Sequence, residues 1–350
     1  MSFKISMVNM TNNRIKNMKL ERKFEVAVLG NGSWATALIK ILTENKKNVK
    51  WYVRKSDDAI QIKKNGRNPK YLTSCKLNIN RLKIESNINK IVDIADVIIV
   101  AIPSIYVFKE LTKIKVDTTK KIFISATKGI LPEKMQVLGE FLHNHFKISL
   151  NQIGIISGPC HAEEIAMERL SYLTLSCLDD MTLKVISNLL KCKYIRVTIS
   201  NDINGTQYAA MLKNCYAIAA GIAYGLGYGD NFMSVLMSNS VREMKKFIKE
   251  ISDVSRDINN SVYLGDMLVT SYSSFSRNRR LGVMLGKGYN IKDALLEINM
   301  TTEGYYGSKS AFQINQDHKC ITPILDSVYS IMYENIDAKK VFKKLESKLD

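Results

Sequence analysis

A short segment near the amino terminus restricts the fold more than any other part of the chain. Residues 24–29 are apolar and β-rich, and residues 33–44 follow as a helix pattern. Between them stands Gly30-Asn31-Gly32-Ser33-Trp34-Ala35, which matches the G-x-G-x-x-G/A turn of dinucleotide-binding units. The first glycine makes the tight turn, the second lets the backbone approach a pyrophosphate, and the small third residue lets the helix pack on the strand. This succession predicts a dinucleotide site that includes Gly30, Gly32, Ser33 and Trp34.

Short apolar strands alternate with helices up to about residue 200. Strand patterns occupy residues 49–54, 97–101, 121–125, 153–156, 172–175 and 194–199, and helix patterns occupy residues 132–146 and 181–191. The alternation predicts a mainly parallel, doubly wound α/β sheet. Ligands bind such sheets beyond the carboxyl ends of the strands. Four strands are followed there by Gly, Pro, Ser or Lys residues, in Gly30-Asn31-Gly32, Pro103-Ser104, Thr127-Lys128-Gly129 and Ser157-Gly158-Pro159-Cys160-His161.

The end of the second strand bears on the choice of cofactor. An acidic residue usually stands there in NAD sites, because it binds the ribose hydroxyls. Here the strand ends in Arg54-Lys55. An arginine can pair with a 2′-phosphate or stack on adenine, so the sequence favours NADP or the use of both cofactors. A solvated Arg-Lys pair is the alternative.

The strand pattern stops after Ser200. Helices are predicted over residues 206–226, 231–251, 264–272, 291–299, 308–316 and 323–334. We therefore expect a dinucleotide-binding domain over residues 24–200, an all-α substrate-binding domain over residues 201–350, and a flexible extension over residues 1–23.

Lys213 is the most informative residue of the first long helix. The residues three and four positions away, which share its helix face, are Ala209, Ala210, Tyr216 and Ala217. Burial among such neighbours lowers the pKa of an amine and makes proton transfer near neutrality feasible. The alternative is a lysine whose stem is buried and whose ammonium reaches water.

Three further polar groups follow Lys213. Asp266 stands after a glycine, and the run Ser276-Arg277-Asn278-Arg279-Arg280 places three arginines in one short stretch. The planar donors of Arg277 suit a phosphate, although such a run is equally compatible with a solvated turn. Glu303 stands beside a turn signal in Thr301-Thr302-Glu303-Gly304 and means little by itself.

The charge balance counts against a nucleic-acid partner. The formal net charge is +18, but the lysines are spread along the whole chain in short pairs, with no arginine-rich block. Such a charge still attracts small anionic ligands. No apolar run approaches the roughly 18 residues of a membrane span. No cluster of His, Cys and carboxylate residues predicts a metal site, and His143 and His145 are expected to be structural.

The compartment follows from the cysteines and the amino terminus. The six cysteines are scattered without a CxxC pair, which favours a reducing cytoplasm over a disulfide framework. Residues 1–23 lack the continuous apolar core of a secretory signal. They are expected to be a short extension, or to precede a true start at Met18.

Taken together, the motifs resemble those of the NAD(P)-dependent glycerol-3-phosphate dehydrogenases of the bacterial type. The resemblance covers about residues 24–340, and its motifs occur in the family's order. Besides the glycine loop these are Asn68-Pro69-Lys70-Tyr71-Leu72, Ser125-Ala126-Thr127-Lys128-Gly129, Ser157-Gly158-Pro159-Cys160-His161-Ala162-Glu163-Glu164, Leu212-Lys213-Asn214, Gly265-Asp266 and Ser276-Arg277-Asn278-Arg279-Arg280.

The resemblance implies a role for each matching residue. Lys213 would be the catalytic proton donor and acceptor, and Asp266 would orient it. The substrate would lie against Lys128, Gly158, Cys160, Lys213, Asp266, Ser276, Arg277 and Asn278. NAD(P)H would lie against Gly30, Gly32, Ser33, Trp34, Arg54, Lys55, Lys128, Ala162, Arg277, Thr301 and Glu303.

The implied reaction reduces dihydroxyacetone phosphate to sn-glycerol 3-phosphate for glycerophospholipid synthesis. The resemblance also suggests a homodimer. Cys160 stands where Ser or Thr is usual. Because a thiol is a weaker donor than a hydroxyl, a contact through its backbone is expected to survive, and whether its side chain contributes is left open. Thr301 is more polar than the usual Val. The rival readings are a 3-hydroxyacyl-CoA or 6-phosphogluconate dehydrogenase, which the Ser276–Arg280 run counts against, and a non-catalytic nucleotide-binding or nucleic-acid-binding protein.

Overall fold

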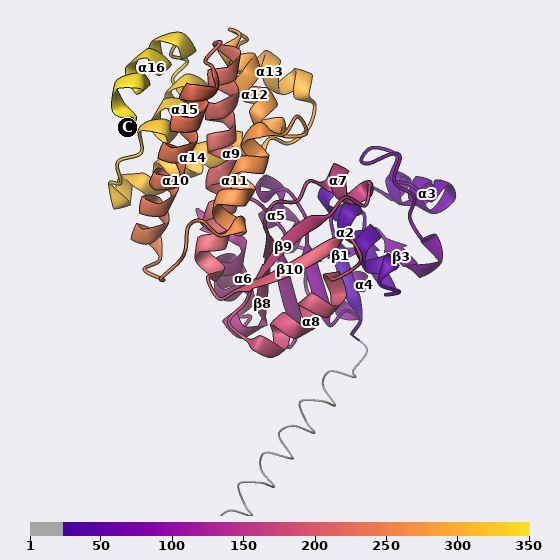
Figure 1. Cartoon of the computed structure of the whole chain (residues 1–350). Coiled ribbons are helices and arrows are strands. Elements are labelled where there is room, and N and C mark those ends of the chain that lie inside the picture. The colour runs from indigo at the N-terminus through magenta and orange to yellow at the C-terminus, as the bar shows by residue number, and fades with distance from the viewer. Residues whose placement is uncertain (1–23) are drawn as a thin grey trace, which may run out of the picture.

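The computed structural model describes residues 24–350. The predictions for residues 1–23, an extension or a start at Met18, lie outside the described residues. Figure 1 shows a sheet flanked by helices, formed by the first part of the chain, and a bundle of helices formed by the second. The sheet ends at Ser200 and the first helix of the bundle begins at Ile203.

The main sheet has eight strands in the order β10-β9-β8-β5-β4-β1-β2-β3. All neighbouring pairs are parallel except β8 with β9. The prediction of a mainly parallel sheet is therefore confirmed. The strands are β1 (Val26–Leu29), β2 (Val49–Tyr52), β3 (Leu82–Glu85), β4 (Val97–Val100), β5 (Ile122–Ser125), β8 (Ile153–Ser157), β9 (Ser171–Ser176) and β10 (Ile195–Ser200).

Helices cover both faces of this sheet, as a doubly wound fold requires. Along β1, Val26 and Val28 belong to one apolar core, and Ala27 and Leu29 belong to the other. This is the alternation of side chains expected for a strand that is buried on both faces. The first core is closed by α2 (Ser33–Glu44), α3 (Ser56–Asn65), α7 (Ala162–Ala166) and α8 (Asp180–Leu190), and the second by α4 (Ile88–Asp93), α5 (Ser104–Leu111) and α6 (Leu138–Phe146).

The helix predicted over residues 132–146 is wrong in its first half. Residues 130–137 form a small hairpin of β6 (Ile130–Leu131) and β7 (Gln136–Val137), and α6 begins at Leu138. Met135 closes the turn with φ 51°, and its N–H donates to the carbonyl of Leu131. The apolar residues of this stretch pack into the cores on either side, and these tertiary contacts override the local helix preference.

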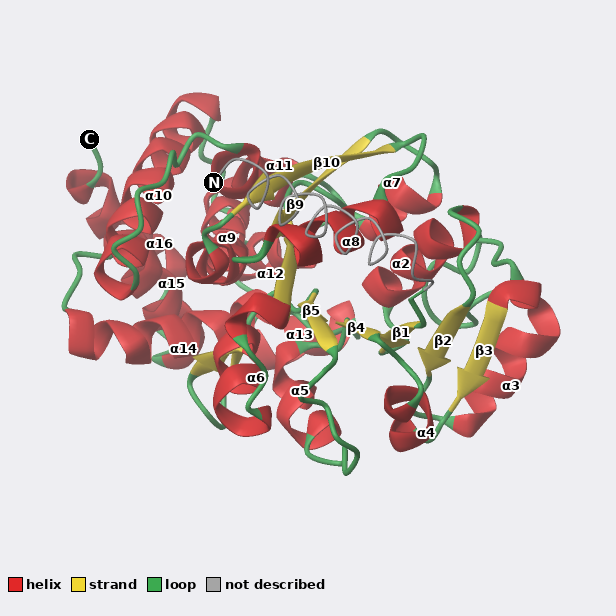
Figure 2. Ribbon diagram, turned by 90° about the horizontal axis from the view of Figure 1, so that it is seen from below, coloured by secondary structure: helices red, strands yellow, loops and turns green. Residues whose placement is uncertain are grey.

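The second half is entirely helical and is built around α9 (Ile203–Gly225), whose residues are nearly all buried. Figure 2 shows the surrounding helices packed to one side of the sheet. They are α10 (Asp230–Ile251), α11 (Asp266–Tyr272), α12 (Arg277–Gly286), α13 (Ile291–Ile298), α14 (Glu303–His318), α15 (Pro323–Tyr333) and α16 (Ala338–Leu345).

Two pairs of glycines bring α9 and α12 into backbone contact. A Cβ on Gly221 would lie 2.1 Å from the carbonyl oxygen of Arg279, and a Cβ on Gly282 would lie 2.1 Å from that of Ile218. Gly225 and Gly286 repeat the contact one turn further along. The arginine run is therefore not a solvated turn: it opens α12, held against the middle of α9.

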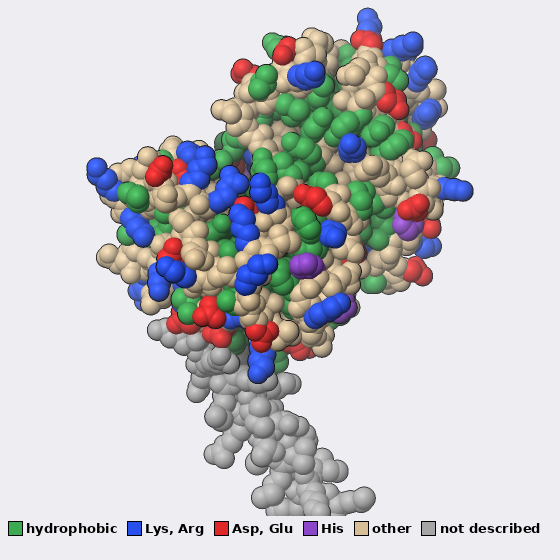
Figure 3. Space-filling view, turned by 180° about the vertical axis from the view of Figure 1, so that it is seen from behind, with side chains coloured by type: hydrophobic (Ala, Val, Ile, Leu, Met, Phe, Trp, Pro, Cys, Tyr) green, Lys and Arg blue, Asp and Glu red, His purple; other side chains and the backbone are tan. Residues whose placement is uncertain are grey.

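Figure 3 shows Lys and Arg side chains scattered over the visible face, in keeping with their spread along the sequence. Within residues 24–350, no helix is long and apolar enough to cross a membrane. The same part of the chain contains no group of His, Cys, Asp and Glu side chains arranged to hold a metal ion.

Candidate active site

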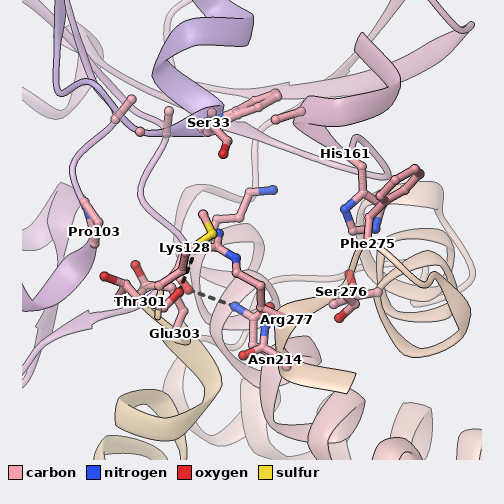
Figure 4. Close-up of a pocket in the computed structure, with 18 of the residues that line it drawn as sticks. Ser33, Pro103, Lys128, His161, Asn214, Phe275, Ser276, Arg277, Thr301 and Glu303 are labelled. Atoms are coloured by element: carbon pink, nitrogen blue, oxygen red, sulfur yellow. Dashed lines mark hydrogen bonds between the residues drawn. The ribbon is translucent and has the colours of Figure 1, made fainter. Parts of the chain in front are cut away.

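A pocket lies where the carboxyl ends of β1, β4, β5 and β8 meet α9, α12 and α14 (Figure 4). Its empty volume is about 1080 Å³, open solvent at the mouth included. Most residues expected to bind ligands line it, namely Gly32, Ser33, Trp34, Lys128, Cys160, Ala162, Lys213, Ser276, Arg277, Asn278, Thr301 and Glu303. Residues from both halves of the chain thus share one pocket.

The glycine loop has the geometry of a phosphate cradle. Gly30 has φ +114°, and a Cβ there would lie 2.5 Å from the carbonyl oxygen of Ala101, so only glycine fits. A Cβ on Gly32 would meet no atom within 4 Å, which leaves the backbone open to the pocket. No side chain caps the amino terminus of α2, so its N–H groups are available to an anion. The indole N–H of Trp34 is buried without a partner among the described residues. These features fit a dinucleotide.

Lys213 projects from α9 into the pocket and forms an ion pair with Asp266. Their exposed fractions are 2% and 1%. Burial lowers the pKa of Lys213; the negative charge of Asp266 opposes this shift, and the positive charge of Lys128 adds to it. Within the described chain, the Asp266 carboxylate has no partner besides Lys213. The Lys213 ammonium is therefore held in place by the charge of Asp266 alone, and no further hydrogen bonds support the carboxylate within residues 24–350.

Lys128 supplies a second positive charge to the pocket. It follows β5, and its ammonium lies 4.9 Å from the centre of the Trp34 ring, in the range of a cation–π contact. This contact joins the end of β5 to the start of α2. Lys128 thus lies near both the glycine loop and Lys213.

A chain of amides locks four elements around the pocket. The Asn214 side chain donates to the carbonyl of Lys128 (3.2 Å) and accepts from the Asn278 side chain (2.8 Å). The Asn278 oxygen accepts from the N–H of Gly304 (2.9 Å). The end of β5, α9, α12 and α14 are thus held in register. Asn278 lines the pocket as expected, but both of its polar atoms also hold the protein together.

The amino terminus of α12 forms an anion-binding corner. The Ser276 hydroxyl accepts from the N–H of Arg279 at 3.2 Å and caps the helix. Arg277 donates to the carbonyl of Thr301 at 2.8 Å, which fixes its guanidinium at the edge of the pocket (Figure 4). A helix amino terminus and a positioned guanidinium together suit a phosphate.

Glu303 joins the two halves of the chain across the pocket. Its carboxylate accepts from the N–H of Ser104 at 3.0 Å and from the Ser104 hydroxyl at 2.5 Å. Burial raises its pKa, although the bonds from Ser104 oppose the shift. A Cβ on Gly129 would lie 2.6 Å from the Ser104 hydroxyl oxygen and 2.7 Å from a Glu303 oxygen, so glycine is required where the β5 loop passes this contact.

Three of the expected cofactor residues, Gly30, Arg54 and Lys55, do not line the pocket; Gly30 forms the turn beneath it, and the other two lie at the end of β2 and just after it. Arg54 is exposed at the end of β2, 3.8 Å from Glu110 and with its guanidinium carbon 6.0 Å from the centre of the Tyr106 ring. Lys55 precedes α3 and is exposed. Their part in cofactor binding stays a prediction.

Gly158 and Cys160 stand in the loop that follows β8, beside the pocket. Gly158 has φ +108°, and a Cβ there would lie 2.9 Å from the carbonyl oxygen of Tyr172. The Cys160 thiol donates to the carbonyl of Gly158 at 3.1 Å, and burial raises the pKa of this thiol. The thiol is thus turned to the backbone of its own loop.

Several lining residues were not singled out as site residues from the sequence. They are Tyr71, Pro103, His161, Asn214, Thr270, Phe275 and Met300. His161 and Pro103 follow strands at the expected edge, and Asn214 adjoins Lys213, so a signal existed for these three. Phe275 adjoins Ser276 and Met300 adjoins Thr301, so the same signal existed for these two. Thr270 reaches the pocket only through the packing of the helices.

Comparison with known proteins gives the same result in both halves. Residues 25–183 match the model of the NAD-dependent glycerol-3-phosphate dehydrogenase N-terminus, and residues 202–343 match that of the C-terminus. Glycerol-3-phosphate dehydrogenase [NAD(P)+] of Staphylococcus aureus (strain JH9) is 32% identical over 323 residues, which are 92% of this chain and 97% of that protein.

Solved structures agree. Glycerol-3-phosphate dehydrogenase from Coxiella burnetii superposes with a TM-score of 0.87 at 26% identity, covering 92% of this chain and 98% of that one. The enzyme of the same name from Plasmodium falciparum shares the fold, with a TM-score of 0.82 at 22% identity over 93% of this chain and 96% of that one. The chain belongs to the NAD-dependent glycerol-3-phosphate dehydrogenase family.

Proposed function

We propose that Lys213 is the proton donor and acceptor in the reaction of this family, the NAD(P)-dependent interconversion of dihydroxyacetone phosphate and sn-glycerol 3-phosphate. The observation that carries the proposal is the buried Lys213–Asp266 pair, which lies at the pocket with no other partner for the carboxylate within residues 24–350. A lysine held in this way is fixed in place and has a lowered pKa, which suits proton transfer.

The glycine loop and its neighbours would hold the dinucleotide. Gly32, Ser33 and Trp34 stand at the open amino terminus of α2, and Ala162, the first residue of α7, lines the same pocket. Thr301 and Glu303 would close the nicotinamide side. When bound, the nicotinamide supplies or receives the hydride at C2 of the substrate.

The phosphate would bind at the amino terminus of α12, beside Arg277. The free energy of binding this remote phosphate then positions the carbonyl group, which by itself has few atoms for the protein to bind. Lys128 and Lys213 add positive charge near the carbonyl oxygen. As the C2 oxygen gains negative charge, the Lys213 ammonium stabilises it and gives its proton to it. In the reverse direction the neutral amine takes that proton back.

The test is consumption of NADH or NADPH by the purified chain with dihydroxyacetone phosphate. We expect loss of reduced-nicotinamide absorbance that requires the ketone phosphate. Folded protein that oxidises neither cofactor would contradict the proposal. The ratio of the two rates reports the role of Arg54, which favours use of NADPH or of both cofactors.

Other parts of the proposal concern the setting of the enzyme. We place it in the cytoplasm, as a homodimer that serves glycerophospholipid synthesis. We also divide the chain at about residue 200 into a dinucleotide-binding and a substrate-binding domain. The expected absence of a nucleic-acid partner belongs to the same proposal. Sedimentation and fractionation of cells test the dimer and the compartment.

A further inference from the structure

We propose that Asn68 is a positioning residue for the dinucleotide, because it holds the glycine loop in the conformation that receives the pyrophosphate. Asn68 belongs to the motif Asn68-Pro69-Lys70-Tyr71-Leu72, which follows α3 and to which the chemistry above gives no role. Its side chain is 1% exposed and does not line the pocket, so it acts through the loop and not on a ligand. This inference rests on the proposed function, which places the cofactor at the glycine loop.

The Asn68 amide joins two segments of the chain. Its nitrogen donates to the carbonyl of Asn31 and to the Thr36 hydroxyl, each at 2.8 Å. Its oxygen accepts from the N–H groups of Lys70 at 3.1 Å and Tyr71 at 3.2 Å. A carbonyl only accepts and a backbone N–H only donates, so these bonds fix the orientation of the amide and use both of its donors. Asn68 thereby ties the loop of Tyr71, which lines the pocket, to the glycine loop.

The bond to Asn31 fixes the peptide between Asn31 and Gly32. In a trans peptide the C=O and the N–H point in opposite directions, so the N–H of Gly32 points away from Asn68. Gly32 is partly exposed and lines the pocket, and a Cβ on it would meet no atom within 4 Å. Within residues 24–350 its N–H donates to no other backbone group and to no side chain that caps α2. This N–H is therefore available to an anion.

The bond to Thr36 acts on the next peptide. The carbonyl of Gly32 accepts from the Thr36 hydroxyl and from the Thr36 N–H, each at 3.0 Å. Because Asn68 donates to the same hydroxyl, the hydroxyl proton is left for this carbonyl. The N–H of Ser33 then points away from the Gly32 carbonyl, and Figure 4 shows Ser33 at the edge of the pocket. Asn68 thus orients two successive N–H groups, one directly and one through Thr36.

The loop needs such support because two of its residues are glycines. Glycine has the widest choice of backbone conformations, and Gly30 and Gly32 stand on either side of Asn31. The carbonyl of Gly30 is also held, by the indole N–H of Trp51 at 2.6 Å. Without a donor on its carbonyl, the Asn31–Gly32 peptide could turn its oxygen toward the pocket and repel a pyrophosphate. A loop already held in its binding conformation loses less entropy when the cofactor binds.

The test measures the dissociation constants of NADH and NADPH by titration of their fluorescence, without substrate. Asn68→Ala should raise both constants by about tenfold, the effect of one hydrogen bond. The factor should be the same for the two cofactors, because both contain the pyrophosphate. In turnover, KM for the cofactor should rise as well, while kcat at saturating cofactor stays within a few-fold. Unchanged dissociation constants in folded protein, or a rise for only one cofactor, would overturn the proposal.

The matched control is Asn315→Ala. Asn315 lies near the end of α14, is 8% exposed and does not line the pocket. Like Asn68, it donates to a backbone carbonyl, that of Cys320, and to a threonine hydroxyl, that of Thr322, each at 2.9 Å. Its replacement should lower the thermal stability about as much as Asn68→Ala does and leave both dissociation constants unchanged. An equal weakening of cofactor binding in this control would attribute the effect to lost stability and overturn the proposal.

Two variants of Thr36 keep the test decisive if Asn68→Ala fails to fold. Val has the shape of Thr without the hydroxyl, whereas Ser keeps the hydroxyl that links Asn68 to the Gly32 carbonyl. We expect Thr36→Val to bind NADH several-fold more weakly than Thr36→Ser. Equal affinities of these two variants would overturn the proposal.

The binding measurement also separates this proposal from the proposed function. If the unchanged chain binds NADH but does not reduce dihydroxyacetone phosphate, the proposed function fails, and the binding of NADH to the variants still decides the role of Asn68. If it reduces dihydroxyacetone phosphate and Asn68→Ala binds both cofactors as tightly as the unchanged chain, only the role of Asn68 fails. If the unchanged chain binds neither cofactor, both fail.

Discussion

Two buried ion pairs, both formed by residues of the helical half, differ in how many partners support them. Asp202, which caps the start of α9, accepts from Arg256 (2.7 Å), from the Tyr263 hydroxyl (2.6 Å) and from the N–H of Gly205 (2.9 Å). Asp266 has Lys213 and, within residues 24–350, nothing else. All four charged side chains are at most 5% exposed. The two pairs are therefore equally buried, but they differ in the number of hydrogen bonds that their carboxylates accept.

The difference fits a structural role for the Asp202 pair and the role proposed for Lys213. A buried charge costs free energy unless hydrogen bonds replace its lost hydration. The Asp202 pair has this compensation, and it ties α9 to the segment before α11. The Lys213 pair lacks it and borders the pocket, so a substrate oxygen can share the ammonium. An incompletely satisfied buried charge beside a cavity is thus the structural sign of reactivity here.

The first prediction removes the ammonium. Lys213→Ala should lower kcat by roughly a thousandfold or more, because both the proton donor and the charge that stabilises the developing oxyanion are lost. Asp266 then loses its partner, so stability should fall, but the protein should still fold, as circular dichroism and cofactor binding will show. Turnover retained within a few-fold would remove Lys213 from its proposed role.

The second prediction breaks the supported pair. Asp202→Ala leaves Arg256 buried without its carboxylate, so the free energy of unfolding should fall by about 3–5 kcal/mol. The kcat of the protein that remains folded should change only a few-fold. Denaturant titration measures the first effect. A loss of turnover as large as that of Lys213→Ala, in fully folded protein, would contradict the distinction between the two pairs.

The third prediction concerns pH. The pKa of Lys213 lies below its usual 10.5, so ketone reduction should decline, and alcohol oxidation should rise, as the pH increases through this lowered value. The folded state also binds fewer protons than the unfolded state between the lowered pKa and 10.5, and the free energy of unfolding should therefore rise with pH in that window. The two pH–rate profiles test this. Inflections at or above 10.5 would disprove the lowered pKa.

The fourth prediction uses the exposed partner of a buried carboxylate, Arg54, and should give the smallest effect on stability. Arg54 lies 3.8 Å from Glu110, which also accepts from the Tyr52 hydroxyl and from Lys113, each at 2.8 Å. Arg54→Gln should change the free energy of unfolding by less than about 1 kcal/mol. The preference for NADPH over NADH should fall by about tenfold, if the guanidinium pairs with the 2′-phosphate. An unchanged preference for NADPH over NADH would show that Arg54 does not contact the 2′-phosphate.

Local sequence patterns predicted the sheet better than they predicted the helices around it. The glycine loop needs a strand before it and a helix after it, and β1 and α2 confirm both. The parallel order of β1, β4, β5 and β8 then brings the four predicted loops to one edge. Short helices such as α3 and α7, and the hairpin at residues 130–137, were not predicted, because their conformation depends on contacts with distant residues.

By itself the sequence determined the local chemistry. It places Gly30 in the turn after the first strand, where a residue without Cβ adopts the positive φ easily. It also places Lys213 on a helix face of small, mostly apolar residues. Tertiary structure alone decided that Lys213 meets Asp266 without further partners for the carboxylate within residues 24–350, and that Asn278 ties α12 to α9. These properties depend on which residues, distant in the sequence, pack next to one another, and on which of their polar atoms are left without a hydrogen bond. The periodicity and spacing of the sequence do not show these contacts, because the contacts form only when the sheet and the helices pack together.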